Sequence, residues 1–270
     1  MAITAADVKK LRDMTGAGMM DAKKALTEAE GDFDKAAELL RISGATKAAS
    51  RSEREASNGL VTAAGNAMIQ LGAETDFVAK NQEFVEMAES IVEAIDKAGV
   101  ETVEDANALK LADGQTVAET IAALSGKIGE KMELVKVARF SGNTHAYLHR
   151  RSQDLPPQVG VLVEFDGTDE DLVHSVALQI ASMSPQYVSE EHVPEDVLSN
   201  EKRIAEATAQ EEGKPEHIIP RIVDGRIKDF IKDVCLHEQP AISDDKVTVG
   251  RLLSDGGVTV SRFARFSTGS

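Results

Sequence analysis

The chain lacks several features from which a function is usually inferred. Its 270 residues contain no tryptophan, and aromatic residues make up only 4%, so platforms for stacking nucleic-acid bases are scarce. The single cysteine, Cys235, excludes an intramolecular disulfide and a zinc site built from several cysteines. Basic residues are too few to balance the acids, because the net charge is -16 and the isoelectric point is near 4.8. We therefore expect no direct binding to nucleic acid or to anionic lipid.

Long apolar segments are also missing. No run approaches the roughly 18 apolar residues that a membrane-spanning helix requires. The first residues, MAITAADVKK, reach polar side chains at once and lack the apolar region of a signal peptide. These absences predict a cytoplasmic protein that has no membrane segment. Its length allows one large domain or two to three small ones.

Motifs for catalysis are not found either. The pairs Gly126-Lys127 and Gly213-Lys214 lack the upstream glycine and the hydroxyl residue of a phosphate-binding loop. No G-x-S-x-G motif supports acyl transfer by a serine. Without a nucleophile and a base in a recognisable pattern, we interpret the chain as a binding protein without a cofactor and not as an enzyme.

Two histidines lie four residues apart in the sequence. His145 and His149 are spaced like a pair of metal ligands, but they flank Ala-Tyr-Leu in a predicted strand. The glutamate of an H-E-x-x-H motif is absent. Histidines that face solvent or an interface are therefore the alternative to a metal site.

Residues 1–54 predict three short helices followed by a linker. Thr4 can cap the first helix, and Asp7 lies three residues later in the pattern of a capping box. Glycines end the helical stretches at Gly16, Gly31 and Gly44. The following stretch, ATKAASRSEREASNG, has no apolar periodicity and reads as the linker. The residues predicted to be buried are Val8 and Leu11, then Met19, Ala22, Leu26 and Ala29, then Phe33, Ala36, Ala37 and Leu40.

Residues 55–193 predict a core of two similar halves, 55–140 and 141–193. In the first half, strands at 60–63 and 67–71 enclose the turn Gly65-Asn66. A helix with apolar residues from Phe84 to Ile95 follows, then a weaker helical region at 117–130 and the strand ELVKVARF. The second half repeats the pattern with a strand at 147–148, the strand GVLVEF and a helix over 172–183. The predicted fold class is α+β, with a duplicated antiparallel sheet backed by helices.

Residues 194–233 differ from this core. The segment EDVLSNEKRIAEATAQEE has high helix propensity but few apolar residues, and a second helix follows the turn at Gly213 to Pro215. Helices with so little to bury predict a helical hairpin that is inserted into the core. Residues 234–270 then return to the sheet through strand-like HEQPAI, a short helix VTVGRLL and the strand VTVSRFARF.

Exposed apolar residues are the best candidates for a binding surface. In the stretch AETDFVAKN, Phe77 lies seven residues before Phe84 and would extend the core stripe on one continuous helix. Asn81 is a preferred N-cap, however, and a second helix beginning there would leave Phe77 and Asp76 on an isolated, outward-facing turn. Met20 lies off the predicted buried stripe, and a tolerated surface methionine is the alternative to a binding residue.

Several segments together resemble a known family. LRDMTGAGMMDAKKAL, ETDFVAKN, KIGEK, GVLVEF and the GKP-containing hairpin occur in this order in bacterial elongation factor Ts, and the resemblance covers about residues 2 to 267. It implies a nucleotide-exchange factor whose partner is the GTPase elongation factor Tu. It also implies a ubiquitin-associated-like three-helix bundle, a two-part core and a helical-hairpin insertion.

The same resemblance implies which residues contact the partner. Those matching the turn that enters the partner's magnesium and nucleotide site are Thr75, Asp76, Phe77 and Val78. Other contacts are implied for Arg12, Met19 and Met20 in the N-terminal helices, for Ile128 and Gly129 in the KIGE motif, and for His149, which the insertion RRSQDLPPQ follows here.

Two departures from the family pattern stand out, and two other function classes stay open. Ala22 replaces the cysteine of many relatives, and a further C-terminal helical module is not expected after FARFSTGS. An adaptor would bind a small domain through residues 1–54 alone. An enzyme with an unrecognised site would turn over a small molecule without any protein partner.

Overall fold

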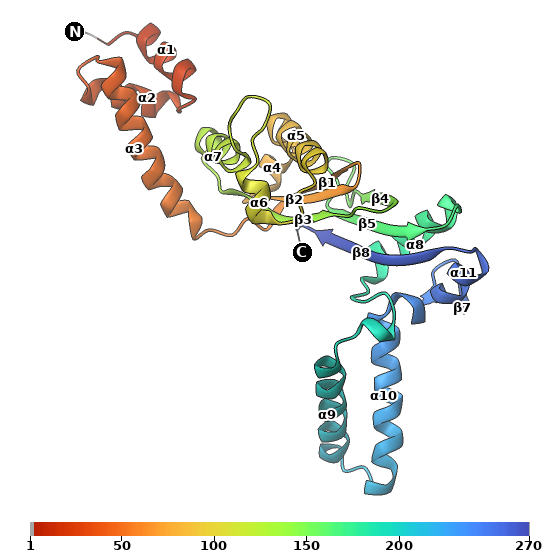
Figure 1. The fold of residues 1–270 in the computed structure, drawn as a ribbon. Coiled ribbons are helices and arrows are strands. Elements are labelled where there is room, and N and C mark those ends of the chain that lie inside the picture. The colour runs from red at the N-terminus through yellow and green to blue at the C-terminus, as the bar shows by residue number, and fades with distance from the viewer. Residues whose placement is uncertain (1–2, 270) are drawn as a thin grey trace. The chain divides into compact units, whose positions relative to one another are not determined.

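The structure, a computed structural model, describes residues 3–269 and, for residues 44–52, the backbone alone. The chain divides into two compact units. Unit 1 comprises Met1–Arg139, Arg150–Val159 and Phe266–Ser270, and unit 2 comprises Phe140–His149 and Gly160–Arg265. Each unit is built from helices and strands, which confirms the predicted α+β class (Figure 1).

The three predicted N-terminal helices are present as α1 (Ala5–Thr15), α2 (Met19–Glu28) and α3 (Phe33–Ser52). Thr4 and Asp7 form the predicted capping box, and hydrogen bonds from Thr4 hold the pKa of Asp7 below its usual value. Leu11 and Leu26 are fully buried and meet small alanines between the helices. These small residues let the three helices pack closely around a modest core.

Two predictions for this region are wrong. Met19 was expected in the buried stripe, but it is the first residue of α2 and is 50% exposed, because the neighbouring helices cover only the later turns. Gly44 was expected to end the third helix, but α3 continues to Ser52 and so takes in the first half of the predicted linker. A glycine costs an exposed helix only about 1 kcal/mol, and the alanine, lysine and arginine residues after it are good helix formers. A segment without apolar periodicity has no continuous face to bury, but it can still form a helix.

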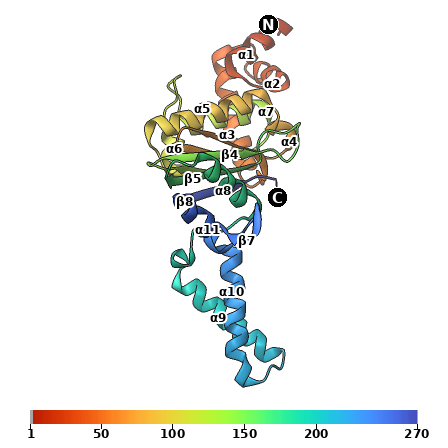
Figure 2. The same cartoon turned by 90° about the vertical axis from the view of Figure 1, so that its right-hand side faces the viewer.

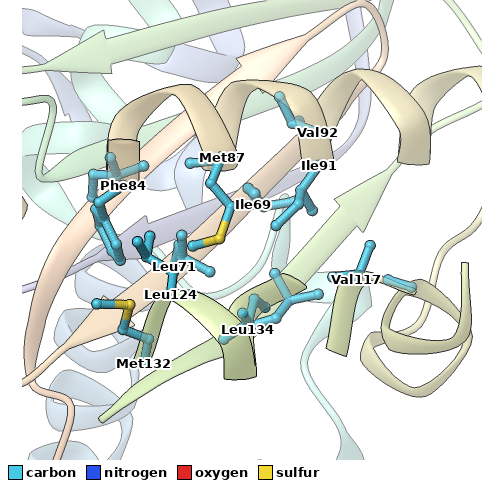
Figure 3. Close-up of a cluster of buried hydrophobic side chains, with 14 of the residues drawn as sticks. Ile69, Leu71, Phe84, Met87, Ile91, Val92, Val117, Leu124, Met132 and Leu134 are labelled. Carbon is cyan, nitrogen blue, oxygen red and sulfur yellow. The ribbon is translucent and has the colours of Figure 1, made fainter. Parts of the chain in front are cut away.

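The sheet of unit 1 contains β1 (Asn58–Ala64), β2 (Ala67–Ala73) and β3 (Met132–Arg139), with β2 in the centre and antiparallel to both neighbours. Helix α5 (Gln82–Ala98) covers one face of it. Figure 3 shows side chains of α5 directed toward Ile69 and Leu71 of β2. The buried residues of α5 are those expected from their spacing: Phe84, Ala88, Ile91, Val92 and Ile95, joined by Met87.

Unit 1 also contains two helices that are shorter than α5. Helix α7 (Val117–Ile128) agrees with the weaker helical region of the sequence, and Val117, Ile121 and Leu124 contribute to the same core. Helix α6 (Val103–Ala108) was not predicted, because its six residues bury only Ala106 and leave little periodic signal.

Unit 2 repeats the plan. Strands β4 (Thr144–His149), β5 (Val159–Asp166) and β8 (Thr259–Ser267) form a sheet whose middle strand is again the second of the three. Helix α8 (Glu170–Met183), capped by Asp169, packs Val173, Val176 and Ile180 into its core. The repeat therefore extends beyond the predicted hairpin and helix to a third strand, which β8 supplies after the insertion.

The insertion is a pair of helices, α9 (Glu195–Glu211) and α10 (Ile219–Val234), which lie side by side (Figure 2). Only Ala205 and Ala209 of α9 are buried, in agreement with its thin apolar stripe. The Arg226 guanidinium binds the Ala205 carbonyl at 3.2 Å and the Glu212 carboxylate at 2.8 Å. Polar bonds thus replace part of the missing apolar packing.

The return from the insertion is only partly as predicted. Strand β6 covers Pro240–Ala241 alone, since the start of HEQPAI lies in the 3-10 helix Leu236–Glu238. Strand β7 (Asp244–Thr248) and helix α11 (Val249–Asp255) precede β8. Within residues 3–269, no helix combines the length and the apolar character that a membrane span requires.

Candidate functional site

A short turn at the end of β2 displays the most exposed large apolar side chain that the structure describes. Helix α4 comprises only Asp76–Ala79, and the Thr75 hydroxyl caps it by accepting from the Val78 amide at 3.4 Å. Val78 is 4% exposed, whereas Phe77 is 79% exposed. Adjacent residues on a helix point about 100° apart, so burial of one leaves the other free to face solvent.

The second cap predicted at Asn81 explains why Phe77 does not extend the core stripe. The Asn81 side chain accepts from the Glu83 amide at 2.9 Å, and α5 begins immediately after it at Gln82. Helices α4 and α5 are therefore separate elements. Phe77 is exposed, as the second of the two alternatives for this residue predicts.

A lysine lies beside both outward-facing residues of the turn. The ammonium of Lys80 lies 3.2 Å from the Asp76 carboxylate, and it also lies 5.8 Å from the ring centroid of Phe77. Both contacts are largely exposed and therefore weak. A partner can displace them at little cost, which leaves Asp76 and Phe77 available for new contacts.

The KIGE motif lies against the same turn. Helix α7 ends at Ile128, and Gly129 follows it in a left-handed conformation with a φ of 91°. This reversal brings the Glu130 carboxylate to the Thr75 hydroxyl, which donates to its two oxygens at 2.9 and 3.1 Å. Ile128 itself packs against the hydrophobic core and Gly129 is exposed.

Glu74 anchors the start of the turn. Its carboxylate accepts a hydrogen bond from the Lys131 backbone amide and lies 3.3 Å from the Arg54 guanidinium. Its carbonyl accepts from the Asn58 side chain at 2.8 Å. Thr75 is also hydrogen-bonded and Val78 is buried, so the inward side of the turn is anchored while Phe77 projects from it.

The N-terminal candidates lie on the surface of the three-helix bundle. Met19 and Met20 are 50% and 76% exposed, and Met14 on α1 is 62% exposed. Arg12 pairs with Asp13 at 2.6 Å on an exposed face of α1. Flexible, polarizable methionines on a surface are suited to contact with a protein partner.

The histidine candidate belongs to a cluster on β4. His149 is exposed, and its Nδ1 lies 3.0 Å from the Tyr147 hydroxyl. His145 does not contact His149 directly. Its Nε2 lies 3.1 Å from Nδ1 of His174 on α8, and the His174 ring also meets the Tyr147 ring edge-on at 5.5 Å. Burial lowers the pKa of His145, the neighbouring His174 lowers it further, and Glu170 opposes both effects. The two histidines of the sequence pair thus have different partners, and no group of three possible metal ligands occurs among the residues that the structure describes.

The arrangement is suited to contact with a protein partner. The residues around Phe77 are an exposed aromatic ring, an ion pair and a buried anchor. Sequence reasoning missed two residues of this site, Glu130 and Lys80, although both lie within motifs that it singled out. Their signal is adjacency: Glu130 directly follows Gly129, and Lys80 lies four residues after Asp76, where helical side chains meet.

Comparison with known proteins gives one consistent answer. The family model described as Elongation factor TS matches residues 74–270, which is more than half of the chain. An elongation factor Ts of Cutibacterium acnes is 62% identical over 269 residues, covering 100% of both chains. Those of Mycolicibacterium gilvum and Mycobacterium avium are 56% and 55% identical, each over 98% of both chains. The chain therefore belongs to the elongation factor Ts family.

Proposed function

We propose that this chain binds elongation factor Tu and accelerates release of its GDP, and thereby supports translation elongation in the cytoplasm. It performs no chemical turnover of its own and needs no cofactor. The family supports the partner and the reaction. The observation that carries the proposal is Phe77, which is 79% exposed on a turn whose inward side is buried.

Exposure of such a residue calls for an explanation. A phenylalanine gains about 1.5 to 3 kcal/mol when it moves from water to an apolar environment. The fold does not use this gain at Phe77, although Val78 beside it is buried. An aromatic side chain on a rigid support is a typical anchor of a protein interface, because little conformational freedom is lost when it binds.

The mechanism follows from how a GTPase holds its nucleotide. Backbone amides surround the phosphates of bound GDP, and Mg²⁺ offsets their charge. Insertion of Phe77 beside this site separates the side chains that form it, and Asp76 disturbs the groups that hold the metal. Acceleration on the order of 10⁴ requires the barrier to fall by about 5.5 kcal/mol, which the loss of a few such contacts can supply. Because coupling is reciprocal, an incoming nucleotide weakens the hold of the factor on its partner.

The remaining candidates are proposed as further contacts. Arg12, Met19 and Met20 would bind through the three-helix bundle, Ile128 and Gly129 through the KIGE reversal, and His149 through β4. We also propose that residues 1–54, 55–193 with 234–270, and 194–233 act as three functional parts, which are the bundle, the core and the inserted hairpin.

Release of a fluorescent GDP analogue from elongation factor Tu tests the proposal. Stopped-flow traces with excess unlabelled GDP should show release that accelerates with the concentration of the chain and then saturates. Absence of any acceleration would refute the function. An adaptor would be favoured if residues 1–54 alone bound a small partner domain as tightly as the whole chain does and the chain did not accelerate GDP release.

A further inference from the structure

We propose that Glu130 is a positioning residue for exchange, which fixes the Thr75 hydroxyl and thereby aims Phe77 and Asp76. It acts through Thr75 and does not itself reach the partner's nucleotide. This inference rests on the proposed function, because it assigns a role within the same site. It has a consequence that can be measured without a partner, which is the local rigidity of the turn.

The hydrogen bonds at Thr75 have a fixed direction. A threonine hydroxyl carries one hydrogen and two lone pairs. The hydrogen is directed at the Glu130 carboxylate, whose oxygens lie 2.9 and 3.1 Å away, so a lone pair is available to the Val78 amide at 3.4 Å. Glu130 therefore orients the group that caps α4. Bonds to a charged acceptor are stronger than bonds between neutral groups.

Glu130 is itself held in place from both sides. Its carbonyl accepts from the Ser125 hydroxyl of α7 at 2.6 Å, and the left-handed Gly129 sets the direction of the chain before it. The next residue, Lys131, donates its backbone amide to Glu74, directly before Thr75. Glu74 and Thr75 are thus bonded to Lys131 and Glu130, although the two segments are more than 50 positions apart in sequence.

Helix α4 depends on these bonds because it cannot persist alone. It has four residues, far fewer than the roughly 12 that an isolated helix needs. Burial of Val78 and Ala79 holds its inner side, and the Thr75 cap holds its start. Without the Glu130 carboxylate, the hydroxyl can rotate away from the Val78 amide. The first turn of α4, which carries Asp76 and Phe77, then loses its order and must regain it during binding.

The variants for a test are set by this geometry. Glu130→Ala removes the acceptor, whereas Glu130→Gln keeps one acceptor oxygen. Thr75→Val removes the hydroxyl, whereas Thr75→Ser keeps it. The matched control is Glu119→Ala, because Glu119 accepts a similar bond from the Thr116 hydroxyl at 3.0 Å, at the opposite end of the same α7.

The first measurement is amide hydrogen exchange of residues 74–80 in the isolated full-length chain, with thermal unfolding alongside. Loss of one bond to a carboxylate should raise exchange of this segment roughly tenfold in Glu130→Ala. Glu119→Ala should leave the segment at the wild-type rate, and Glu130→Gln should fall between them. Unchanged exchange in Glu130→Ala would overturn the proposal, whatever the function of the chain.

The second measurement is stimulated release of the GDP analogue over a range of factor concentrations. We expect the maximal rate to fall roughly tenfold in Glu130→Ala and in Thr75→Val, with most of it retained in Thr75→Ser. The double variant Thr75→Val with Glu130→Ala should lose no more than Thr75→Val alone, because Thr75→Val already removes both the bond to Glu130 and the bond to the Val78 amide. Losses that multiply in the double variant would overturn the proposal. If the wild-type chain fails to stimulate release, the proposed function fails, and hydrogen exchange still decides the role of Glu130.

Discussion

Replacing Phe77 with alanine should separate the interface from the fold. The ring is 79% exposed, and the ammonium of Lys80 lies 5.8 Å from its centroid. Surface substitutions of this kind change the free energy of unfolding by about 0.5 kcal/mol or less. We therefore expect Phe77→Ala to unfold at the same urea concentration as the wild-type chain.

The effect on exchange can be estimated from the same exposed fraction. Full burial of a phenylalanine stabilises by about 1.5 to 3 kcal/mol, and about four fifths of this remains to be gained at Phe77. The resulting roughly 1.2 to 2.4 kcal/mol corresponds to a loss of about 8- to 60-fold in the apparent second-order rate constant of GDP release. A larger loss would mean that the ring acts in the transition state beyond simple burial.

Stopped-flow release of a fluorescent GDP analogue from elongation factor Tu is the assay. Phe77→Leu should retain most of the rate constant, because leucine keeps much of the apolar area. Ile242→Ala is the matched control, since Ile242 is also a large apolar residue, 59% exposed, and lies outside every proposed contact. It should leave the rate constant unchanged.

Three results would refute this reasoning. Equal rate constants for Phe77→Ala and the wild-type chain would show that the ring gains nothing on binding. A similar loss in Ile242→Ala would show that exposed apolar residues contribute irrespective of their position. Loss of stability in Phe77→Ala would contradict the exposed placement of the ring.

Four further results are expected. Val78→Ala should lower the free energy of unfolding by roughly 2 kcal/mol in urea titrations, because its side chain is 4% exposed in the core. Gly59→Ala should cost about 3 kcal/mol or more by thermal unfolding, since φ is 129° and the new Cβ would stand 2.0 Å from the Leu71 carbonyl oxygen. Burial lowers the pKa of His145, so the unfolded chain binds the proton more readily. Stability should therefore fall as the pH drops below about 6.5, and urea titrations at two pH values should show a smaller fall for His145→Gln. Burial raises the pKa of Cys235 to about 11, so a thiol reagent at pH 8 should react with the native chain far more slowly than with the unfolded chain.

Local signals predicted most of the fold. Helix starts at Thr4 and Asn81 were found because a capping side chain bonds within three residues of itself. The buried face of α5 was found because its apolar residues repeat at the helical period. Met19 was misplaced because periodicity identifies a face of a helix and does not say how far along it the neighbouring helices reach.

The site was predictable to a lesser extent. Exposure of Phe77 followed from the cap at Asn81, which is a local feature. The link from Glu130 to Thr75 joins residues 55 positions apart, and no spacing rule indicates such a contact. The role of Glu130 is also ambiguous in the sequence, because a glutamate that follows a helix is most often simply exposed to solvent. The antiparallel register of β2 and β3, which pairs Ala73 with Met132, and the left-handed reversal at Gly129 together bring the two groups into contact.

The support beneath Phe77 bears on how exchange can work. Burial of Val78 fastens α4 to the same core that includes Leu71 of β2 and Phe84 of α5. A ring mounted on a packed core resists displacement, since interiors at this density deform little. Under the proposed function, we therefore expect the partner's groups to move when Phe77 enters the nucleotide site, while the factor remains in place. The strain falls on the contacts that hold phosphate and Mg²⁺, and a nucleotide that restores them must expel the ring. Rigidity at Val78, Thr75 and Glu130 is thus what directs the coupling toward the partner.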